Sequence, residues 1–247
     1  MNNLPAENKK NLPDVVDVKG LPAVFGTMEL GFGHEKVEGI NEIEMPRAKL
    51  VQFTSDEAQA TDPSDRVNPG LIINSITRQE VGKEFVPVFK FTTFTQWNPR
   101  KKDDPNYDPA FDPGEMIFTT NDPLDKRVRE GISFGPNGES PKVTRYMNFL
   151  TYFPGQKLPL ILSFAKSSMK AGERLNTLAL SAGGNMFDNK YKIVTRLKEG
   201  AEGKYFVFEV VPSGSANEEE KKIGALWFRL CYNQTLKVHA EAEETQS

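Results

Sequence analysis

Alternating apolar and polar positions predict a chain built mainly from β-strands. The run EFVPVFKFTTFTQW at 84–97 is rich in aromatic and β-branched residues and suits a long, twisted strand. Alternation places one set on one face, namely Phe89, Phe91, Thr93, Thr95 and Trp97. The other face carries Val88, Lys90, Thr92, Phe94 and Gln96. Neither face is purely apolar, so one can be buried while the other presents aromatic rings beside a lysine.

Further strands are predicted on both sides of this run. Apolar pieces at 23–30 and 49–53 favour short strands, and VTRYMNFLTYF and LPLILSF favour two longer ones split by Pro154–Gly155. NKYKIVTRLK and KYFVFEVVP flank the turn EGAEG and predict a hairpin. In its first strand, the cations at 190, 192, 196 and 198 share one face, opposite Tyr191 and Ile193.

Two segments have helical spacing. The first, 167–180, has Ser167 or Ser168 to cap its start and Gly183–Gly184 to end it. Its predicted apolar side consists of Ala171, Leu175, Leu178 and Ala179, and its other side of Met169, Gly172 or Glu173, and Asn176. The second, EEEKKIGALWFRLCYNQ, opens with acids after Asn217, as helix starts favour.

The segment 98–142 is dense in Pro, Gly and Asp, which opposes long helices and central strands. A strand enters it at Trp97 and another leaves near Val143, so we predict an elaborated hairpin arm. Residues 1–22 predict a flexible leader, and 233–247 an acidic, disordered tail. The fold class is mainly β: one domain at 23–232, an antiparallel β-barrel with a long hairpin arm and one or two helices.

Composition favours a folded protein in a reducing compartment. With 247 residues, 38% of them hydrophobic, the chain can bury a real core. The single cysteine, Cys231, excludes an internal disulfide and makes the cytoplasm the expected location. No apolar run reaches the roughly 18 residues of a membrane-spanning helix, and the start lacks a secretory signal. We therefore expect no membrane association.

Motifs for catalysis are weak. His34 and His239 lie far apart, zinc-site and phosphate-loop spacings are absent, and we expect no cofactor and no bound metal. Ser-x-x-Lys spacings at 163–166 and 167–170 lack the other elements of a serine-lysine site, so we expect no enzyme. One alternative is a metal-dependent hydrolase built on four loop carboxylates, although a solvated loop explains them more simply: Asp103, Asp104, Asp108 and Asp112.

The net charge of −3 hides a basic segment. Between Lys142 and Lys204 there are eleven Lys or Arg and four Asp or Glu, so this stretch is +7 and the remainder −10. The local field governs the encounter with phosphate more than the net charge does. The segment therefore makes nucleic acid a candidate partner.

Cations and aromatic rings are also interleaved, and proteins that bind single strands use cations for phosphates and flat rings for bases. For each ring the simpler alternative is a place in the core. A β-barrel with a basic groove and a long arm is typical of an oligonucleotide-binding (OB) fold. The predicted contact residues are Lys90, Phe91, Trp97, Arg100, Lys101, Arg145, Tyr146, Tyr152, Lys166, Lys170, Arg174, Lys190, Lys192, Arg196 and Lys198.

The two tryptophans have different predicted roles. Trp97 ends the long strand beside Arg100 and Lys101, where it either carries a base or closes the barrel end. Trp227 lies on the apolar spacing of the last helix and is predicted to be core.

Several short motifs occur together: PGLIINSI at 69–76, FVPV at 85–88 leading to WNPR at 97–100, NFL at 148–150, LILSF at 160–164, and the helix at 167–178 with Lys170, Arg174 and Asn176. As a set, they resemble those of bacteriophage single-stranded-DNA-binding proteins. The resemblance covers about residues 67–232 and implies an OB-like barrel that coats single strands during phage replication or recombination. The acidic tail, with Glu241, Glu243 and Glu244, is similar to tails that recruit replication partners.

We therefore expect sequence-tolerant binding of single-stranded DNA, without catalysis, in the cytoplasm of the host cell. Replication or recombination proteins and further copies of the chain are the other candidate partners. The alternative is a phage structural or assembly protein that binds no nucleic acid. An assembly role gives no reason to gather a charge of +7 in one segment, which favours the first interpretation.

Overall fold

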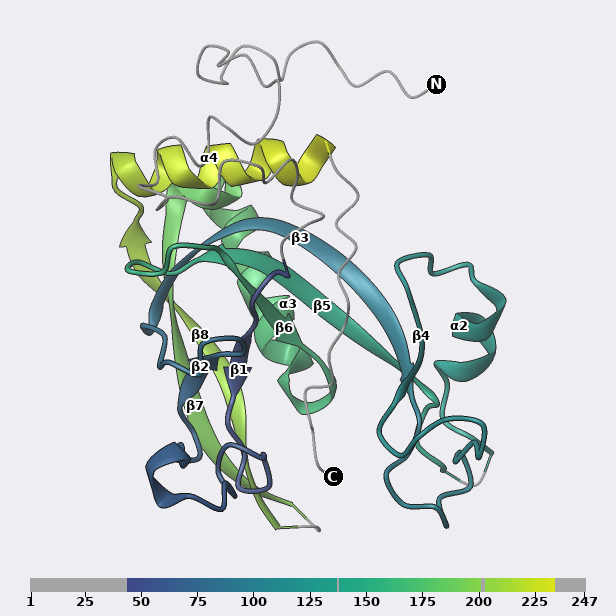
Figure 1. Ribbon diagram of the computed structural model, residues 1–247. Helices are drawn as coiled ribbons and strands as arrows, with labels where there is room; N and C mark the ends of the chain where they lie inside the picture. The colour runs from purple at the N-terminus through teal and green to yellow at the C-terminus, as the bar shows by residue number, and fades with distance from the viewer. Residues whose placement is uncertain (1–43, 137, 201–202, 234–247) are drawn as a thin grey trace, which may run out of the picture.

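A computed structural model describes residues 44–136, 138–200 and 203–233 (Figure 1). The predicted leader, the predicted strand at 23–30 and the tail after Asn233 lie outside these residues. The strands are β1 (Ala48–Leu50), β2 (Ile72–Asn74), β3 (Glu84–Trp97), β4 (Met116–Thr120), β5 (Val143–Tyr152), β6 (Leu160–Phe164), β7 (Asn189–Gly200) and β8 (Gly203–Ser215). The α-helices are α2 (Lys126–Gly131), α3 (Met169–Ala182) and α4 (Glu218–Asn233), and short 3₁₀ helices cover Pro63–Asp65, Lys166–Ser168 and Met186–Asp188.

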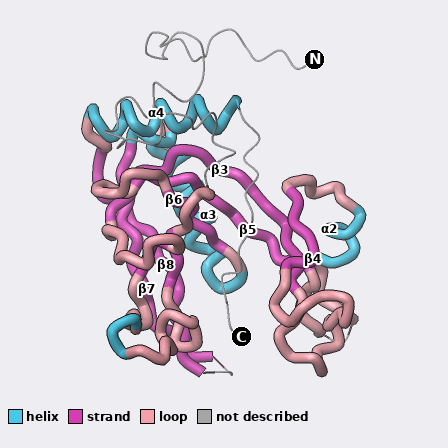
Figure 2. Tube along the Cα trace, in the orientation of Figure 1, coloured by secondary structure: helices cyan, strands magenta, loops and turns pink. Residues whose placement is uncertain are grey.

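Strands dominate the fold (Figure 2). The large sheet is antiparallel. Its hydrogen-bonded order is β6-β5-β3-β7-β8, with β4 paired to β3 off this path, while β1 and β2 form a separate pair. The mainly β class is confirmed. Strand pairing does not close a barrel within the described residues; instead α3 contacts both edge strands, β6 and β8.

Strand β3 organises the sheet and coincides with the predicted run. It pairs with β5 from Val86↔Tyr152 to Gln96↔Val143, with β7 at its start and with β4 at its end. The register shifts between Pro87 and Phe89. Because of this bulge, Val88 packs in the same cluster as Phe89. The predicted alternation was therefore wrong at Val88, since one extra residue reverses the phase of everything before it.

The main core lies between the curved sheet and α3. Phe149, Phe164 and Ile193 are fully buried there, together with Leu175 of α3. A Cβ on Gly172 would lie only 2.8 Å from the Cβ of Phe164, so glycine allows α3 to approach β6 closely. The prediction that put Gly172 on the side away from the apolar residues was wrong for this reason.

The ends of α3 match the predicted boundaries. Ser168 occupies the N-cap, and Gly183 follows the last turn with φ of 69°, which suits glycine. Ser168 makes no side-chain capping bond; its Oγ accepts a hydrogen bond from the backbone N–H of Phe208 at 3.4 Å. The serine therefore links the helix to β8 rather than capping it as predicted.

Helix α4 covers part of the opposite face of β3 and β5. Trp227 is 1% exposed and packs with Val88 and Leu150, which confirms the predicted core position. Asn217 and Glu220 form a capping box at the helix start: the N–H of Glu220 donates to Asn217 Oδ1 at 2.9 Å, and the N–H of Asn217 donates to Glu220 Oε2 at 2.8 Å. This confirms the predicted start of the second helix. None of the described helices is both long enough and apolar enough to cross a membrane.

The predicted arm is more ordered than its composition suggests. The returning strand does begin at Val143, but the segment also contains β4 and α2, so the described residues hold three α-helices rather than one or two. Phe94, Phe118, Val128 and Val143 form a small core of their own. Prolines did not exclude a strand here because β4 is an edge strand with no proline inside it.

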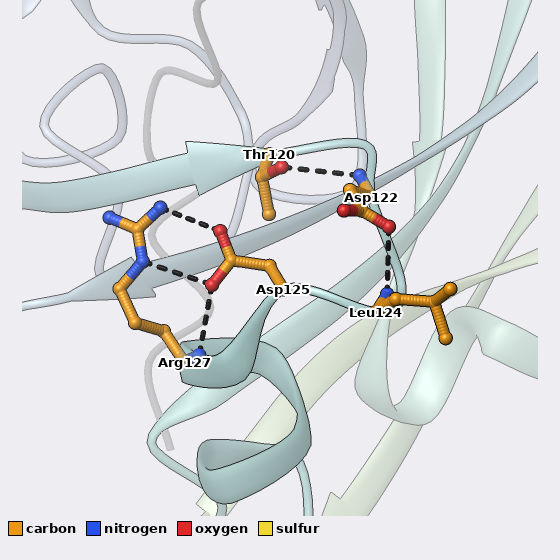
Figure 3. A network of polar contacts seen from close by, with 5 residues as sticks. All are labelled: Thr120, Asp122, Leu124, Asp125 and Arg127. Atoms are coloured by element: carbon orange, nitrogen blue, oxygen red, sulfur yellow. Dashed lines mark hydrogen bonds and ion pairs between the residues drawn. The ribbon is translucent and has the colours of Figure 1, made fainter.

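A polar turn joins β4 to α2 (Figure 3). Thr120 Oγ1 accepts a hydrogen bond from the N–H of Asp122 at 3.1 Å, and Asp122 Oδ1 accepts from the N–H of Leu124 at 2.8 Å. Asp125 caps α2 and also pairs with the Arg127 guanidinium at 2.7 Å, which lies 4.2 Å over the ring of Phe118. The turn is therefore built from local side-chain bonds.

Candidate nucleic-acid interface

Strand β7 carries its cations on one face, as the alternation predicts. Tyr191 and Ile193 are buried in the main core, whereas Lys192, Arg196 and Lys198 are exposed. The hairpin register pairs Val194 with Glu209, so an acidic residue of β8 lies on the same face as the cations.

Glu209 is hydrogen-bonded to one cation and feels the charge of two others. Arg196 Nε donates to Glu209 Oε2 at 2.6 Å. The hydrogen bond and charge of Arg196 lower the pKa of Glu209, and Arg174 of α3 and Lys198 of β7 lower it further. We call Arg174, Arg196, Lys198 and Glu209 the Glu209 cluster. Three cations around one carboxylate leave two positive charges in excess.

The start of α3 adds further exposed lysines. Lys170 lies one turn before Arg174 and therefore on the same side of the helix. Lys166 is exposed in the short 3₁₀ helix before α3 and has a φ of 45°, which is rare outside glycine. Both extend the positive charge of α3 beyond the Glu209 cluster.

Lys190 has a different environment from the other cations of β7. Its Nζ lies 2.8 Å from Glu220 Oε1 and 4.0 Å from Glu84 Oε2. The hydrogen bond with Glu220 raises the pKa of Lys190. The charge of Lys190 is therefore matched by Glu220 at the start of α4 and Glu84 at the start of β3, which makes it less available to phosphate than the exposed cations of β7.

Most of the predicted stacking rings are packed in the structure. Tyr146 is 5% exposed, and Phe91 stacks on Phe89 with centroids 6.1 Å apart. Tyr152 packs against the core cluster that contains Trp227. Burial is the main cause that raises the pKa of Tyr152, and the charges of Glu219 and Glu220 raise it further. Tyr146 is buried, whereas Phe91 and Tyr152 are half-buried. The simpler alternative, a place in the core, describes Tyr146, while Phe91 and Tyr152 pack at the margin of a core cluster.

Trp97 keeps part of its surface accessible. It is half-buried at the end of β3, and its Nε1 donates to the Tyr146 hydroxyl at 3.2 Å. The bond holds the indole in one orientation beside the base of the arm, where Arg100 and Lys101 are exposed.

Two other predicted cations lie on the hairpin of β3 and β5. Lys90 is half-buried opposite Phe149, and Arg145 is exposed opposite Phe94. These pairs face the side of the sheet that carries the main core and the core of the arm. They belong to different elements from the Glu209 cluster.

The acidic loop of the arm is ordered around Asn98. Asn98 is 1% exposed, and its Nδ2 donates to the carbonyls of Asp108, Phe111 and Asp112 at 2.9, 2.9 and 3.1 Å. Asp104 and Asp108 accept hydrogen bonds from backbone N–H groups two residues on. No group of three or more His, Cys, Asp or Glu in the described residues is arranged to hold a metal. These carboxylates stabilise turns.

Sequence reasoning missed Glu209 and Asn98. Glu209 had a detectable signal: it is the lone acid in FVFEVVP, and the short EGAEG turn places it opposite Val194. Asn98 had no such signal, because its partners become neighbours only when the loop folds around it.

These features describe a mainly antiparallel β protein with an exposed, net positive cluster on its last hairpin and α3. A family model described as Pam3 phage gp34-like protein matches residues 16–226, and the chain belongs to this phage protein family. No curated protein and no solved structure matches the chain. The resemblance to phage proteins is thereby confirmed at the level of a phage family.

Proposed function

We propose that the chain is a non-catalytic protein that binds single-stranded DNA without sequence preference. The Glu209 cluster carries this proposal. Arg174, Arg196 and Lys198 come from α3 and β7, yet all three act on Glu209, Arg196 through a hydrogen bond and the other two through their charge. Exposed cations that lie close together neutralise phosphates and release the counterions condensed on the nucleic acid. This release provides affinity without sequence preference.

The order of the elements supports an OB-like interpretation. Apart from the arm, which contains β4 and α2, the chain runs β3-β5-β6-α3-β7-β8, and β3 pairs with both β5 and β7 at the centre of the sheet. This is the strand order of an OB fold with its helix between the third and fourth strands, and such folds are partly open barrels. The arm then corresponds to the loop between the first two strands. OB folds contact oligonucleotides through that loop and the one between the last two strands.

The chemistry needed for tolerant binding is limited to charge and stacking. Successive bases stack on aromatic faces whatever their identity, so base-edge hydrogen bonds are not required. Trp97 keeps part of its surface accessible, and its hydrogen bond to the Tyr146 hydroxyl fixes its orientation. We propose that it carries a base near Lys101. The host cytoplasm is the proposed location, with replication or recombination proteins as further partners.

A titration with a fluorescently labelled oligothymidine at 50 and 200 mM salt tests the proposal. With roughly three to five phosphate contacts and a slope of ~0.7 per contact, the higher salt lowers affinity about 20-fold to 130-fold. Duplex of the same length binds more weakly, because its bases cannot stack on side chains. Absence of binding at low salt, or binding that ignores salt, would contradict the proposal.

A second candidate function is phage assembly without nucleic-acid binding. Leu124 and Phe134 lie on the arm and are 71% and 72% exposed, unusual for large apolar side chains. Light scattering of the full chain over a range of concentrations tests this alternative. An assembly role predicts oligomers that Leu124→Ser with Phe134→Ser dissociates, together with no oligonucleotide binding by either protein.

A further inference from the structure

Glu209 occupies the place in the cluster where a phosphate oxygen is expected. It accepts from Arg196 Nε at 2.6 Å, the side of the guanidinium that phosphates also use. Glu209 lies on β8 and Arg196 on β7, so the hairpin register holds the two together. The side chains of Arg196 and Glu209 are 65% and 35% exposed, so the pair is open to solvent and to a ligand.

An exposed ion pair of this kind is easily exchanged. Water and salt screen it, and its contribution to folding is small. A phosphate that approaches Arg196 therefore meets little resistance from the fold. The phosphate is nevertheless repelled by the negative charge of Glu209, because β8 keeps this side chain near Arg196. That repulsion also affects contacts with Arg174 and Lys198, because both interact with the same carboxylate through their charge.

We propose that Glu209 is an internal competitor of phosphate that limits the affinity of the cluster for single-stranded DNA. Binding exchanges the Arg196–Glu209 ion pair for an Arg196–phosphate contact. The inference rests on the proposed function and deepens it. Its physical consequence is that loss of the Glu209 charge strengthens binding, whereas loss of a residue that merely positions Arg196 would weaken it.

The test compares Glu209→Gln with the unchanged full chain in the oligothymidine titration. Glutamine keeps the size of the side chain and removes the charge. Removing one like charge a few ångströms from bound phosphate tightens binding about three- to tenfold at low salt. The dependence on salt becomes steeper by up to ~0.7, since one more cation is available to replace counterions. Glu209→Thr, which suits a strand, gives the same direction.

Glu218→Gln is the matched control. Glu218 forms a similar exposed pair with Lys221 at 2.8 Å, but it lies on α4, outside the cluster. The Glu218→Gln substitution removes one negative charge, as Glu209→Gln does, so the net charge changes equally in both variants. The expected affinity of this control is that of the unchanged chain, within about twofold.

The outcomes separate the inference from the proposed function. If the unchanged chain binds but Glu209→Gln and Glu209→Thr, both folded by thermal melting, bind equally or more weakly, Glu209 is not a competitor. If Glu218→Gln tightens binding as much, the effect is one of net charge and the inference is again overturned. If neither the unchanged chain nor Glu209→Gln binds at low salt, the proposed function itself fails.

Discussion

Lys190 Nζ lies 2.8 Å from Glu220 Oε1, so a cation of β7 is joined to the first turn of α4. Glu220 is 6% exposed and also closes the capping box with Asn217. Removing Lys190 therefore leaves a buried carboxylate with one fewer partner. This ion pair distinguishes Lys190 from the exposed cations that share its face of β7.

Lys190→Met is expected to destabilise the fold by about 1–3 kcal/mol, the usual cost of leaving a buried polar group without its partner. Affinity for the oligonucleotide stays unchanged. Lys192→Met, on the exposed part of the same face, has the opposite profile: weaker binding, and stability within about 0.5 kcal/mol. Urea denaturation and the titration measure both properties. Weaker binding by a fully stable Lys190→Met would restore Lys190 as a phosphate contact.

The Lys190–Glu220 pair also predicts a dependence on pH. The pKa of Lys190 is raised above its ordinary value of 10.5. A raised folded-state pKa stabilises the fold fully below pH 10.5 and loses this effect as pH rises through the raised value. The stability difference between the unchanged chain and Lys190→Met is therefore constant at neutral pH and shrinks above pH 10.5. Urea denaturation at pH 8 and pH 11 tests this; an equal difference at both would contradict it.

Arg174 and Lys198 supply the excess charge of the Glu209 cluster. Arg174→Gln with Lys198→Gln is expected to lower the slope of log affinity against log salt by about 1.4, or ~0.7 for each lost contact. Stability changes by less than about 0.5 kcal/mol, since both residues are exposed. The matched control is Lys221→Gln with Lys222→Gln on α4, which removes the same charge outside both the arm and the Glu209 cluster. An equal loss in the control would mean that binding follows net charge rather than this cluster.

The two tryptophans are expected to respond differently to truncation. Trp227→Ala destabilises the fold by about 3–5 kcal/mol because Trp227 is 1% exposed and anchors α4. Trp97→Ala costs less stability and loses about 1–3 kcal/mol of binding if the indole carries a base. A Trp227→Phe background isolates Trp97 fluorescence, which the oligonucleotide should quench. Unchanged fluorescence at saturation would assign Trp97 to packing alone.

Asn98 is expected to control the order of the arm loop. Asn98→Ala removes three donated hydrogen bonds and the acceptor of the N–H of Asp108 at 2.8 Å, so we expect a loss of about 2 kcal/mol or more. Limited proteolysis then cuts within 99–115 faster than in the unchanged chain. Asn106→Ala is the control in the same loop, and its cleavage rate stays the same. Equal protection in both variants would show that other contacts hold the loop.

Much of the fold was predictable from local patterns. The 84–97 strand, the β7–β8 hairpin and the last helix follow from residue periodicity and turn chemistry, which act over a few neighbours. Local patterns did not predict the bulge at Val88 or the burial of Gly172, because each depends on a partner strand or helix. The same limit hid α2 and β4, whose small core requires Val143 to return beside Phe94.

In the candidate site, too, local sequence patterns determined some features and tertiary packing determined the others. Alternation along 189–200 was enough to place four cations on one face, since side-chain direction in a strand depends only on position. Which of those cations stay available was settled by packing between distant segments. Lys190 meets Glu220 through the docking of α4, and Arg196 and Lys198 meet Glu209 and Arg174 through the hairpin register and α3. Coulombic interactions depend on distance in space, which a linear pattern does not specify.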